Sequence, residues 1–386
     1  MAHASRPSTA PVNEVPTSAR VLGAVGRGLI TAGIIVLLFV VFQLWGTNFQ
    51  EARAQDDLRS EFDEVFADAQ TQLVAISSGD GDAVIDAGST QDDASQLPTP
   101  DTTLPGGFTP EVLRYFFPED GDAVARIEMP TIGVDKIVVN GVQVADLRTG
   151  PGHYPGTAAV GTEGNTAIAG HRTTYGAPFN RIDELSPGDE IHVTGVLGRF
   201  TYRVLDPQSA FPDQLPTVDT EGAGHVIVRP GATWVLGDFG DNRVTLTACH
   251  PKLSSRQRII VAAELVEAPV EAPEFDEETI AAFVDQEGFE LPSEELDGEA
   301  EQGSPVPEQR TTENLDEGLN GERGAIPGAV VWLILATALW VLGGYVGRRF
   351  FTERMHRLAV RVASLAPVGF CLWFAFEMID RALPAG

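Results

Sequence analysis

The chain has 386 residues and a formal net charge of -29, with 26 Lys and Arg residues against 55 Asp and Glu residues. This excess of acids argues against nucleic acid as a partner, because phosphate binding needs clustered basic side chains. The two cysteines, Cys249 and Cys371, have such different sequence surroundings that no disulfide is expected between them. Long hydrophobic and acidic stretches take up much of the length, which leaves room for one globular domain.

Three hydrophobic segments are long enough to cross a membrane. They cover residues 21–46, 326–346 and 358–380, and a helix of roughly 20 apolar residues spans the hydrocarbon core of a bilayer. A cleaved signal peptide is the alternative for the first segment. Its apolar run is longer than a usual signal core and no clear small-residue cleavage site follows, so we expect an uncleaved anchor. Pro367 interrupts the third segment.

Basic residues predict how these segments are oriented. They occur in the tail of residues 1–20 and are concentrated in the loop of residues 347–357, between the second and third spans. Because cytoplasmic segments carry an excess of Lys and Arg, both are expected inside the cell. Residues 47–325 and the short tail of residues 381–386 are then expected outside. The pattern predicts a multi-pass protein of the cell membrane.

Three segments outside the membrane have no β-strand pattern. Residues 47–76 carry apolar side chains at helical spacing among many charges, which predicts an amphipathic stalk helix between the membrane and the domain. Residues 77–122 and 266–325 are too polar to bury a core and are predicted to be acidic flexible linkers. Between residues 266 and 323 there are 19 acidic and two basic side chains, as in a solvated spacer.

Residues 123–265 have the pattern of a β-rich domain. Short runs of Val, Ile, Thr and aromatic residues are separated by Gly, Pro, Asn and Asp. The eight runs are A-R-I-E-M, K-I-V-V-N-G-V, T-A-I-A-G, E-I-H-V-T-G-V, R-F-T-Y-R-V-L, T-W-V-L, V-T-L-T-A and R-I-I-V-A-A-E-L. They predict a mainly β fold, a closed or nearly closed eight-stranded barrel with few short helices, with transmembrane helices at both ends of the chain.

Cys249 and His171 both end strand-like runs. Cys249 is the only cysteine of the predicted outer domain, and the loop that follows it contains proline, which exposes a strand-end side chain. A cysteine enzyme needs a base or counter-cation that is near in space and distant in sequence, and His171 lies 78 residues before the cysteine. Taken singly, a packing cysteine and a structural histidine remain open as alternatives.

Two arginines follow the cysteine. Arg258 opens the run R-I-I-V-A nine residues after Cys249, so a β-hairpin would bring its guanidinium back beside the thiol. A multi-donor cation there can stabilise the oxyanion of an acyl-transfer intermediate and hold the substrate backbone. Arg256 is a rival two positions away, and strand alternation would place both on one face if both were in the strand. We favour Arg258 because it directly adjoins the apolar run.

At these residues the sequence resembles a known family. T-L-T-A-C-H-P-K-L-S-S-R-Q-R-I-I-V resembles the sortase signature T-L-x-T-C with its downstream arginine, and A-I-A-G-H-R-T-T-Y-G-A-P-F resembles the histidine segment of the same family. The resemblance covers residues 123–265, and the segments after the cysteine and the histidine are most similar to class E sortases of actinobacteria. Two separate motifs in the expected order make the resemblance specific.

The resemblance implies a fold, a reaction and partners. It implies a sortase-type barrel with Cys249 as the nucleophile that forms an acyl thioester, His171 as general acid and base, and Arg258 as oxyanion and substrate clamp. Secreted proteins with a C-terminal L-A-x-T-G or L-P-x-T-G sorting signal would be cleaved between Thr and Gly. They would then be joined to an amine of a lipid-linked peptidoglycan precursor at the membrane. A thiolate and imidazolium pair would suit this chemistry, and neither a metal nor a cofactor is implied.

Substrate contacts are expected at two further residues. Tyr154 lies where similar sortases carry a tyrosine linked to acceptance of L-A-x-T-G signals, with a packing tyrosine as the equal alternative. Thr247, in the T-L-T-A-C run, is the second candidate. The family usually has Thr where this chain has Ala248, so a hydroxyl contact to substrate is expected to be absent there or supplied elsewhere.

Other functions are weighed against this one. His153 and His250 could suggest a metal site with Cys249 and His171, but their spacing lacks the pairing of zinc ligands, and the acidic linkers lack the loop pattern of calcium sites. A pilin-polymerising sortase that uses a lysine acceptor is the same-fold alternative. A non-catalytic membrane-anchored barrel that only binds a partner is the alternative from another class.

Overall fold

The computed structural model describes residues 17–77, 110–212, 224–273, 275, 279–281 and 323–382. Residues 1–16 of the predicted cytoplasmic tail, most of both predicted linkers and residues 383–386 lie outside the described residues. The predictions made for those segments stay predictions.

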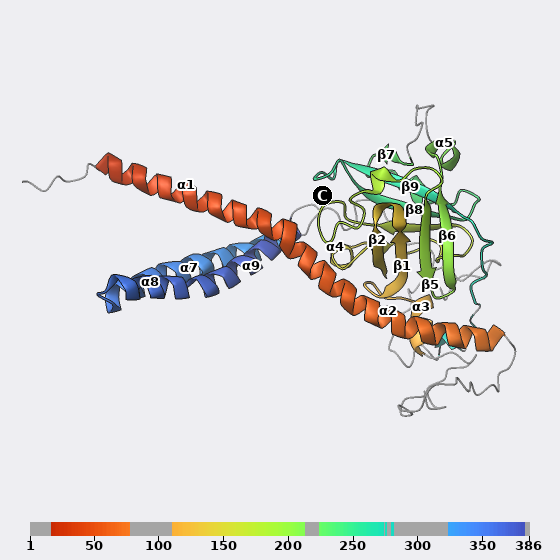
Figure 1. The fold of residues 1–386 in the computed structure, drawn as a ribbon, viewed down its shortest axis with the longest axis horizontal. Coiled ribbons are helices and arrows are strands. Elements are labelled where there is room, and N and C mark those ends of the chain that lie inside the picture. The colour runs from red at the N-terminus through yellow and green to blue at the C-terminus, as the bar shows by residue number, and fades with distance from the viewer. Residues whose placement is uncertain are drawn as a thin grey trace, which may run out of the picture.

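Nine strands of the described chain form one sheet (Figure 1). The strands are β1 (Ala123–Met129), β2 (Val134–Asn140), β3 (Gly152–His153), β4 (Asn165–Ala169), β5 (Glu190–Gly195), β6 (Gly198–Val204), β7 (Val226–Val228), β8 (Arg243–His250) and β9 (Gln257–Leu265). Their order is β6-β5-β1-β2-β3-β4-β8-β9-β7, and β6 also pairs with β9. That pairing closes eight strands into a barrel, and β7 pairs with the first half of β9 along the same edge that β6 pairs with further on. The predicted eight-stranded barrel is confirmed.

One of the eight predicted strands is not a strand, and two of the observed strands were not predicted. T-W-V-L is not a strand but the 3-10 helix η6 (Thr233–Leu236), whose Trp234 packs edge-on against Phe211 at 5.2 Å between ring centroids. The Asn165 side chain donates hydrogen bonds to the carbonyls of Val235 and Gly237, at 3.0 Å each. These backbone carbonyls therefore bond to a side chain and not to the backbone of a neighbouring strand. The strands β3 and β7 were missed because two and three residues are too short for a period-two pattern.

The barrel strands separate two apolar clusters. Along β8, Leu246 and Ala248 belong to the core cluster that fills the barrel. Because successive side chains of a strand point to opposite faces, Thr247 and Cys249 face outward. That outer face is covered by residues 205–211 and 226–239, which include α5 (Pro207–Ala210) and η6, and Cys249 lies in the second cluster with them. Within residues 123–265 the described helices are few and short, as predicted; besides α5 and η6 they are α4 (Val144–Leu147), η4 (Pro130–Ile132) and η5 (Ile182–Glu184).

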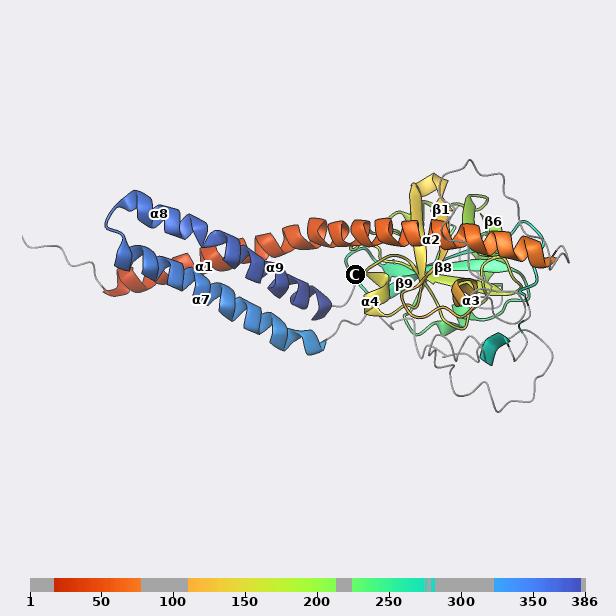
Figure 2. The same cartoon turned by 90° about the horizontal axis from the view of Figure 1, so that it is seen from below.

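The predicted stalk is a helix, but it is not a free spacer. The helix α1 (Thr17–Val41) continues through a π-helical turn, η1 (Phe42–Gly46), into α2 (Thr47–Ser77), and α2 lies along the barrel wall (Figures 1 and 2). Phe62 is buried against β1 and β2. The Gln55 side chain donates to the carbonyl of Ile137 at 3.0 Å and accepts from its N–H at 2.7 Å, as a neighbouring strand would.

Part of the first predicted linker is also folded. The helix α3 (Pro110–Phe116) lies within it and buries Leu113 against Ala69 of α2 and Val196 of the barrel. The apolar side chains at the end of this linker are few, but they complete a small core between α2 and the barrel. The linker prediction is therefore wrong for residues 110–122, where the chain packs on the domain.

Two helices at the C-terminal end are long and apolar enough to cross a membrane. They are α7 (Ile326–Phe350) and the continuous stretch Arg354–Ala382, which contains α8 (Arg354–Ala363) and α9 (Leu365–Ala382). The helices α7 and α9 pack side by side through stacked rings, with Trp332 and Phe374 at 5.0 Å (Figure 2). Near the N-terminus the apolar helix Gly28–Val41 is shorter. Phe42 packs against Trp373 of α9, at 4.8 Å between ring centroids.

Candidate active site

The strands β4 and β8 bring Cys249 and His171 to one edge of the sheet. These strands are parallel neighbours, with Ala169 opposite Thr247 in the ladder. The N–H of Gly170 donates to the carbonyl of Thr247 at 3.0 Å, which continues the pairing past the end of β4. Each of the two candidate residues lies two positions beyond this matched pair. Because parallel strands end at the same edge, their side chains emerge side by side.

Arg258 reaches the same place from the next strand. It is the direct antiparallel partner of Cys249 in the β8–β9 ladder, and directly opposed residues of such a ladder project to the same face. Its guanidinium donates to the carbonyls of Ser255 at 2.8 Å and Gln257 at 2.9 Å, which holds the side chain in place. Arg256 lies before the first residue of β9 and is exposed. Of the two arginines, only Arg258 is brought into register with the cysteine.

Burial governs the protonation of His171. The relative exposures of Cys249, His171 and Arg258 are 1%, 2% and 1%. Burial, together with the positive charge of Arg148, lowers the pKa of His171 to about 4. The imidazole is therefore neutral in the free protein at pH 7. This differs from the expected imidazolium, because the sequence pattern gave no measure of how deeply the ring is buried.

Tyr154 and Thr247 are joined on the outer face of the barrel. Their hydroxyl oxygens are 3.0 Å apart in a buried hydrogen bond. Tyr154 follows β3, whose residues pair with β4, and Thr247 lies two positions before Cys249 on β8. The two candidate substrate contacts therefore form one polar unit beside the cysteine.

Ala248 points away from this unit. It belongs to the cluster inside the barrel and is almost fully buried. A hydroxyl at this position would face the barrel interior, not a peptide beside Cys249. The departure from the family pattern at Ala248 consequently changes core packing, and Thr247 is the β8 threonine on the outer face, which also carries Cys249.

Sequence reasoning missed Arg172, which links the two motif loops. Its guanidinium donates to the carbonyl of Cys249 at 3.3 Å, contacts Nδ1 of His250 at 2.9 Å and forms a 2.9 Å ion pair with Asp183. Asn180 donates to the carbonyl of Arg172 at 2.8 Å. A charged side chain that is 2% exposed needs such partners. Its position directly after His171 was the available signal, but its partners depend on the tertiary fold.

The histidines considered as metal ligands have other partners. No group of three or more metal-ligating side chains occurs within the described residues. Nε2 of His153 lies 3.1 Å from the carbonyl oxygen of Ala158 and 3.0 Å from the hydroxyl of Thr157, and His250 contacts Arg172. The geometry of this site suits acyl transfer by a thiol, with a neutral base and a fixed cation beside it.

Comparison with known proteins places this domain in context. A family model described as Sortase domain matches residues 127–266. The chain is 30% identical over 252 residues to Sortase SrtE1 of Streptomyces coelicolor, covering 63% of this chain and 57% of that protein. It is 28% identical over 256 residues to Sortase SrtE2 of the same organism, covering 64% and 83% of the two proteins. The solved structure of sortase E from Streptomyces avermitilis is 33% identical and covers 41% of this chain and 97% of that one, with a TM-score of 0.31.

Proposed function

The chain belongs to the sortase family, and we propose that it is a membrane-anchored cysteine transpeptidase that attaches secreted proteins to the cell wall. The observation that carries this proposal is the register of three strands. The ladders β4–β8 and β8–β9 place a histidine and an arginine on the two sides of one buried cysteine. These residue types supply the base, the oxyanion donor and the nucleophile that acyl transfer requires.

In the first step the Cys249 sulfur attacks the Thr carbonyl carbon of a sorting signal. His171, neutral in the free protein, takes the thiol proton as the carbon–sulfur bond forms. The guanidinium of Arg258 stabilises the negative charge on the carbonyl oxygen. The Thr–Gly bond then breaks, and the departing glycine amine takes the proton from His171. The product is a thioester between the client protein and Cys249.

In the second step an amine resolves this thioester. His171 accepts the proton that the amine loses as it attacks, and then returns a proton to the sulfur. We place this amine on a lipid-linked peptidoglycan precursor, which would reach the site along the membrane. Anchoring the enzyme at the same surface raises the effective concentration of both substrates.

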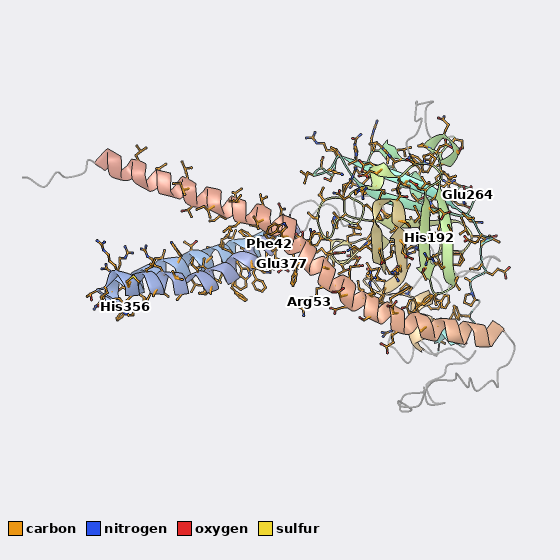
Figure 3. The ribbon with its side chains drawn as sticks, viewed as in Figure 1. Phe42, Arg53, His192, Glu264, His356 and Glu377 are labelled. Carbon is orange, nitrogen blue, oxygen red and sulfur yellow. The ribbon has the colours of Figure 1, made fainter. Side chains whose placement is uncertain are left out.

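The arrangement of the helices supports a multi-pass topology with the barrel outside. The connection between α7 and α8 lies at the end of the helical bundle far from the barrel, where Figure 3 labels His356. Glu377 and Phe42, at the other end, lie where α9 and α1 meet next to the barrel (Figure 3). Arg348 and Arg349 lie in the last turn of α7, at the end far from the barrel. The positive-inside rule assigns that end to the cytoplasm.

The proposed reaction is tested with the full-length protein in detergent. It is incubated with L-A-x-T-G and L-P-x-T-G peptides and a small primary amine, and products are identified by mass spectrometry. We expect cleavage between Thr and Gly and a Thr-amide product of the added amine, both absent from the Cys249→Ala variant. Tight peptide binding without cleavage would instead favour a barrel that only binds its partner. Transfer only to a lysine peptide would favour pilin polymerisation.

A further inference from the structure

We propose that the C-terminal membrane helix α9 completes the active site through Asp380, which holds Tyr175 against His171. Asp380 is thereby a positioning residue for the general base. The inference rests on the proposed function, in which His171 transfers the proton. It assigns to the membrane helices a part in catalysis in addition to anchoring.

The loop that carries Tyr175 has an unfavourable backbone. Tyr175, Gly176 and Ala177 have φ angles of 49°, 70° and 43°. Positive φ is unfavourable for residues that carry a Cβ, so Tyr175 and Ala177 strain this backbone. Gly176 has a further reason to be glycine, since a Cβ there would lie 2.3 Å from a carboxylate oxygen of Glu51. Such a loop keeps its shape only where outside contacts hold it.

Those contacts come from the helices at the membrane side. The N–H of Tyr175 donates to the hydroxyl of Thr47 at 3.4 Å, and the N–H of Gly176 donates to the Asn48 side chain at 2.9 Å. The Tyr175 hydroxyl donates to the carboxylate of Asp380, which lies in the last turn of α9. Two of these residues belong to the start of α2 and one to α9. The loop is therefore held between the start of α2, where the chain leaves the predicted first span, and the last turn of α9.

Tyr175, held by these contacts, packs against His171. The two rings lie 5.2 Å apart between centroids, at an interplanar angle of 34°. On its other side, the guanidinium of Arg148 lies 5.4 Å from the Tyr175 ring centre and pairs with Asp380 at 3.9 Å. The Asp380 side chain is only 7% exposed. A buried carboxylate, a tyrosine hydroxyl and a guanidinium thus form one unit behind the imidazole.

This unit leaves the tyrosine ring little freedom. The Tyr175 ring is bonded to Asp380 at its hydroxyl and covered on one face by Arg148, so it cannot turn away from the imidazole. It therefore limits the orientations that the His171 ring can adopt. Loss of the Asp380 carboxylate would free the hydroxyl and remove the ion-pair partner of Arg148, which is 17% exposed. A shift of about 1 Å in the base is enough to slow proton transfer, by up to about a hundredfold.

The test compares Asp380→Asn, Asp380→Glu and Tyr175→Phe with wild type in the full-length protein. We expect Asp380→Asn and Tyr175→Phe each to lower kcat by about ten- to a hundredfold with little change in KM for the peptide. The double variant should be no worse than either single one, because both remove the same contact. Asp380→Glu should recover part of kcat. The control is Glu377→Gln on the same helix, whose carboxylate pairs with Arg381 at 2.7 Å; it should remain close to wild type.

A second measurement separates this inference from the reaction itself. Hydrogen exchange of residues 171–179 should become at least tenfold faster in Asp380→Asn and stay unchanged in Glu377→Gln. Active Asp380→Asn protein with wild-type kcat and wild-type exchange would overturn the inference while leaving the transpeptidase proposal in place. If wild type cleaves no peptide but the exchange still rises in Asp380→Asn, the contact stands and the transpeptidase proposal fails.

Discussion

Cys249 and Arg258 oppose each other directly across the β8–β9 ladder, and both are almost fully buried. The Arg258 guanidinium donates to the backbone carbonyls of Ser255 and Gln257, so some of its N–H groups hold the side chain in position. The planar fork has further donors, which we expect to stabilise an oxyanion beside the thiol. A single ammonium cannot serve both purposes.

Replacing Arg258 with Lys should therefore lower kcat/KM by about 10²–10³-fold, although the charge is kept. Arg256→Lys is the matched control, because Arg256 is exposed and lies outside β9. Both variants are assayed with the same peptide and amine. A dead Arg256 variant beside an active Arg258 variant would show that the wrong arginine has been assigned.

The pair of Tyr154 and Thr247 should affect signal choice more than chemistry. An alanine in the second position of the signal keeps an amide hydrogen that proline lacks, and the partner we expect for it is the Tyr154 hydroxyl, which is bonded to Thr247 beside the cysteine. Tyr154→Phe removes one hydrogen bond of about 0.5–1.5 kcal/mol. The preference for L-A-x-T-G over L-P-x-T-G should then fall by roughly two- to tenfold. Thr247→Ser, which keeps the hydroxyl, is the control, and an unaltered ratio of the two kcat/KM values would make Tyr154 a packing residue.

The titration of His171 follows from its surroundings. Its pKa in the free protein should lie near 4, because burial and the charge of Arg148 both disfavour the imidazolium. Arg148→Gln removes the second cause, so the pKa should rise toward 6.5 without reaching it. Nuclear magnetic resonance of histidine-labelled protein measures both values, with His171→Gln to assign the signal. The kcat/KM profile should stay flat as pH falls from 7 and decline only near the lower pKa. A value at or above 6.5 in wild type would contradict this prediction.

Topology is tested by protease treatment of intact cells. The barrel of residues 123–265 should be digested from outside, and the basic segment of residues 347–357 should be cut only after the membrane is opened. A tag inserted at each place gives the readout by immunoblot. Outside access to the basic segment with a protected barrel would reverse the orientation.

The barrel, and the meeting of Cys249, His171 and Arg258 at one end of its strands, could be predicted because both follow from local patterns. Cys249 and His171 end apolar runs, and the turn after β8 is short enough to return Arg258 to the cysteine. The sequence pattern left Arg256 as a rival. The register excludes it from the ladder, because β9 begins at Gln257.

Contacts between distant segments were not predictable in this way. Arg172 meets the Cys249 carbonyl across 77 positions, and Tyr175 meets Asp380 across 205. Neither has a spacing rule, since both depend on how separate elements pack. The helix α2 looked like a spacer for the same reason: its apolar face was visible, and the barrel wall that covers it was not. T-W-V-L has strand-like composition, but its aromatic ring packs with Phe211 under the outer loops.

The central claim is that Cys249 carries the client protein as a thioester, and trapping that intermediate tests it most directly. Full-length protein is mixed with an L-A-x-T-G peptide without amine, quenched in acid and digested for mass spectrometry. We expect the peptide containing Cys249 to gain the mass of the signal up to its threonine, and to lose it on treatment with hydroxylamine. Cys249→Ala should show neither the adduct nor cleavage. Cleavage between Thr and Gly that persists in Cys249→Ala, with no adduct on the wild-type cysteine, would contradict the claim.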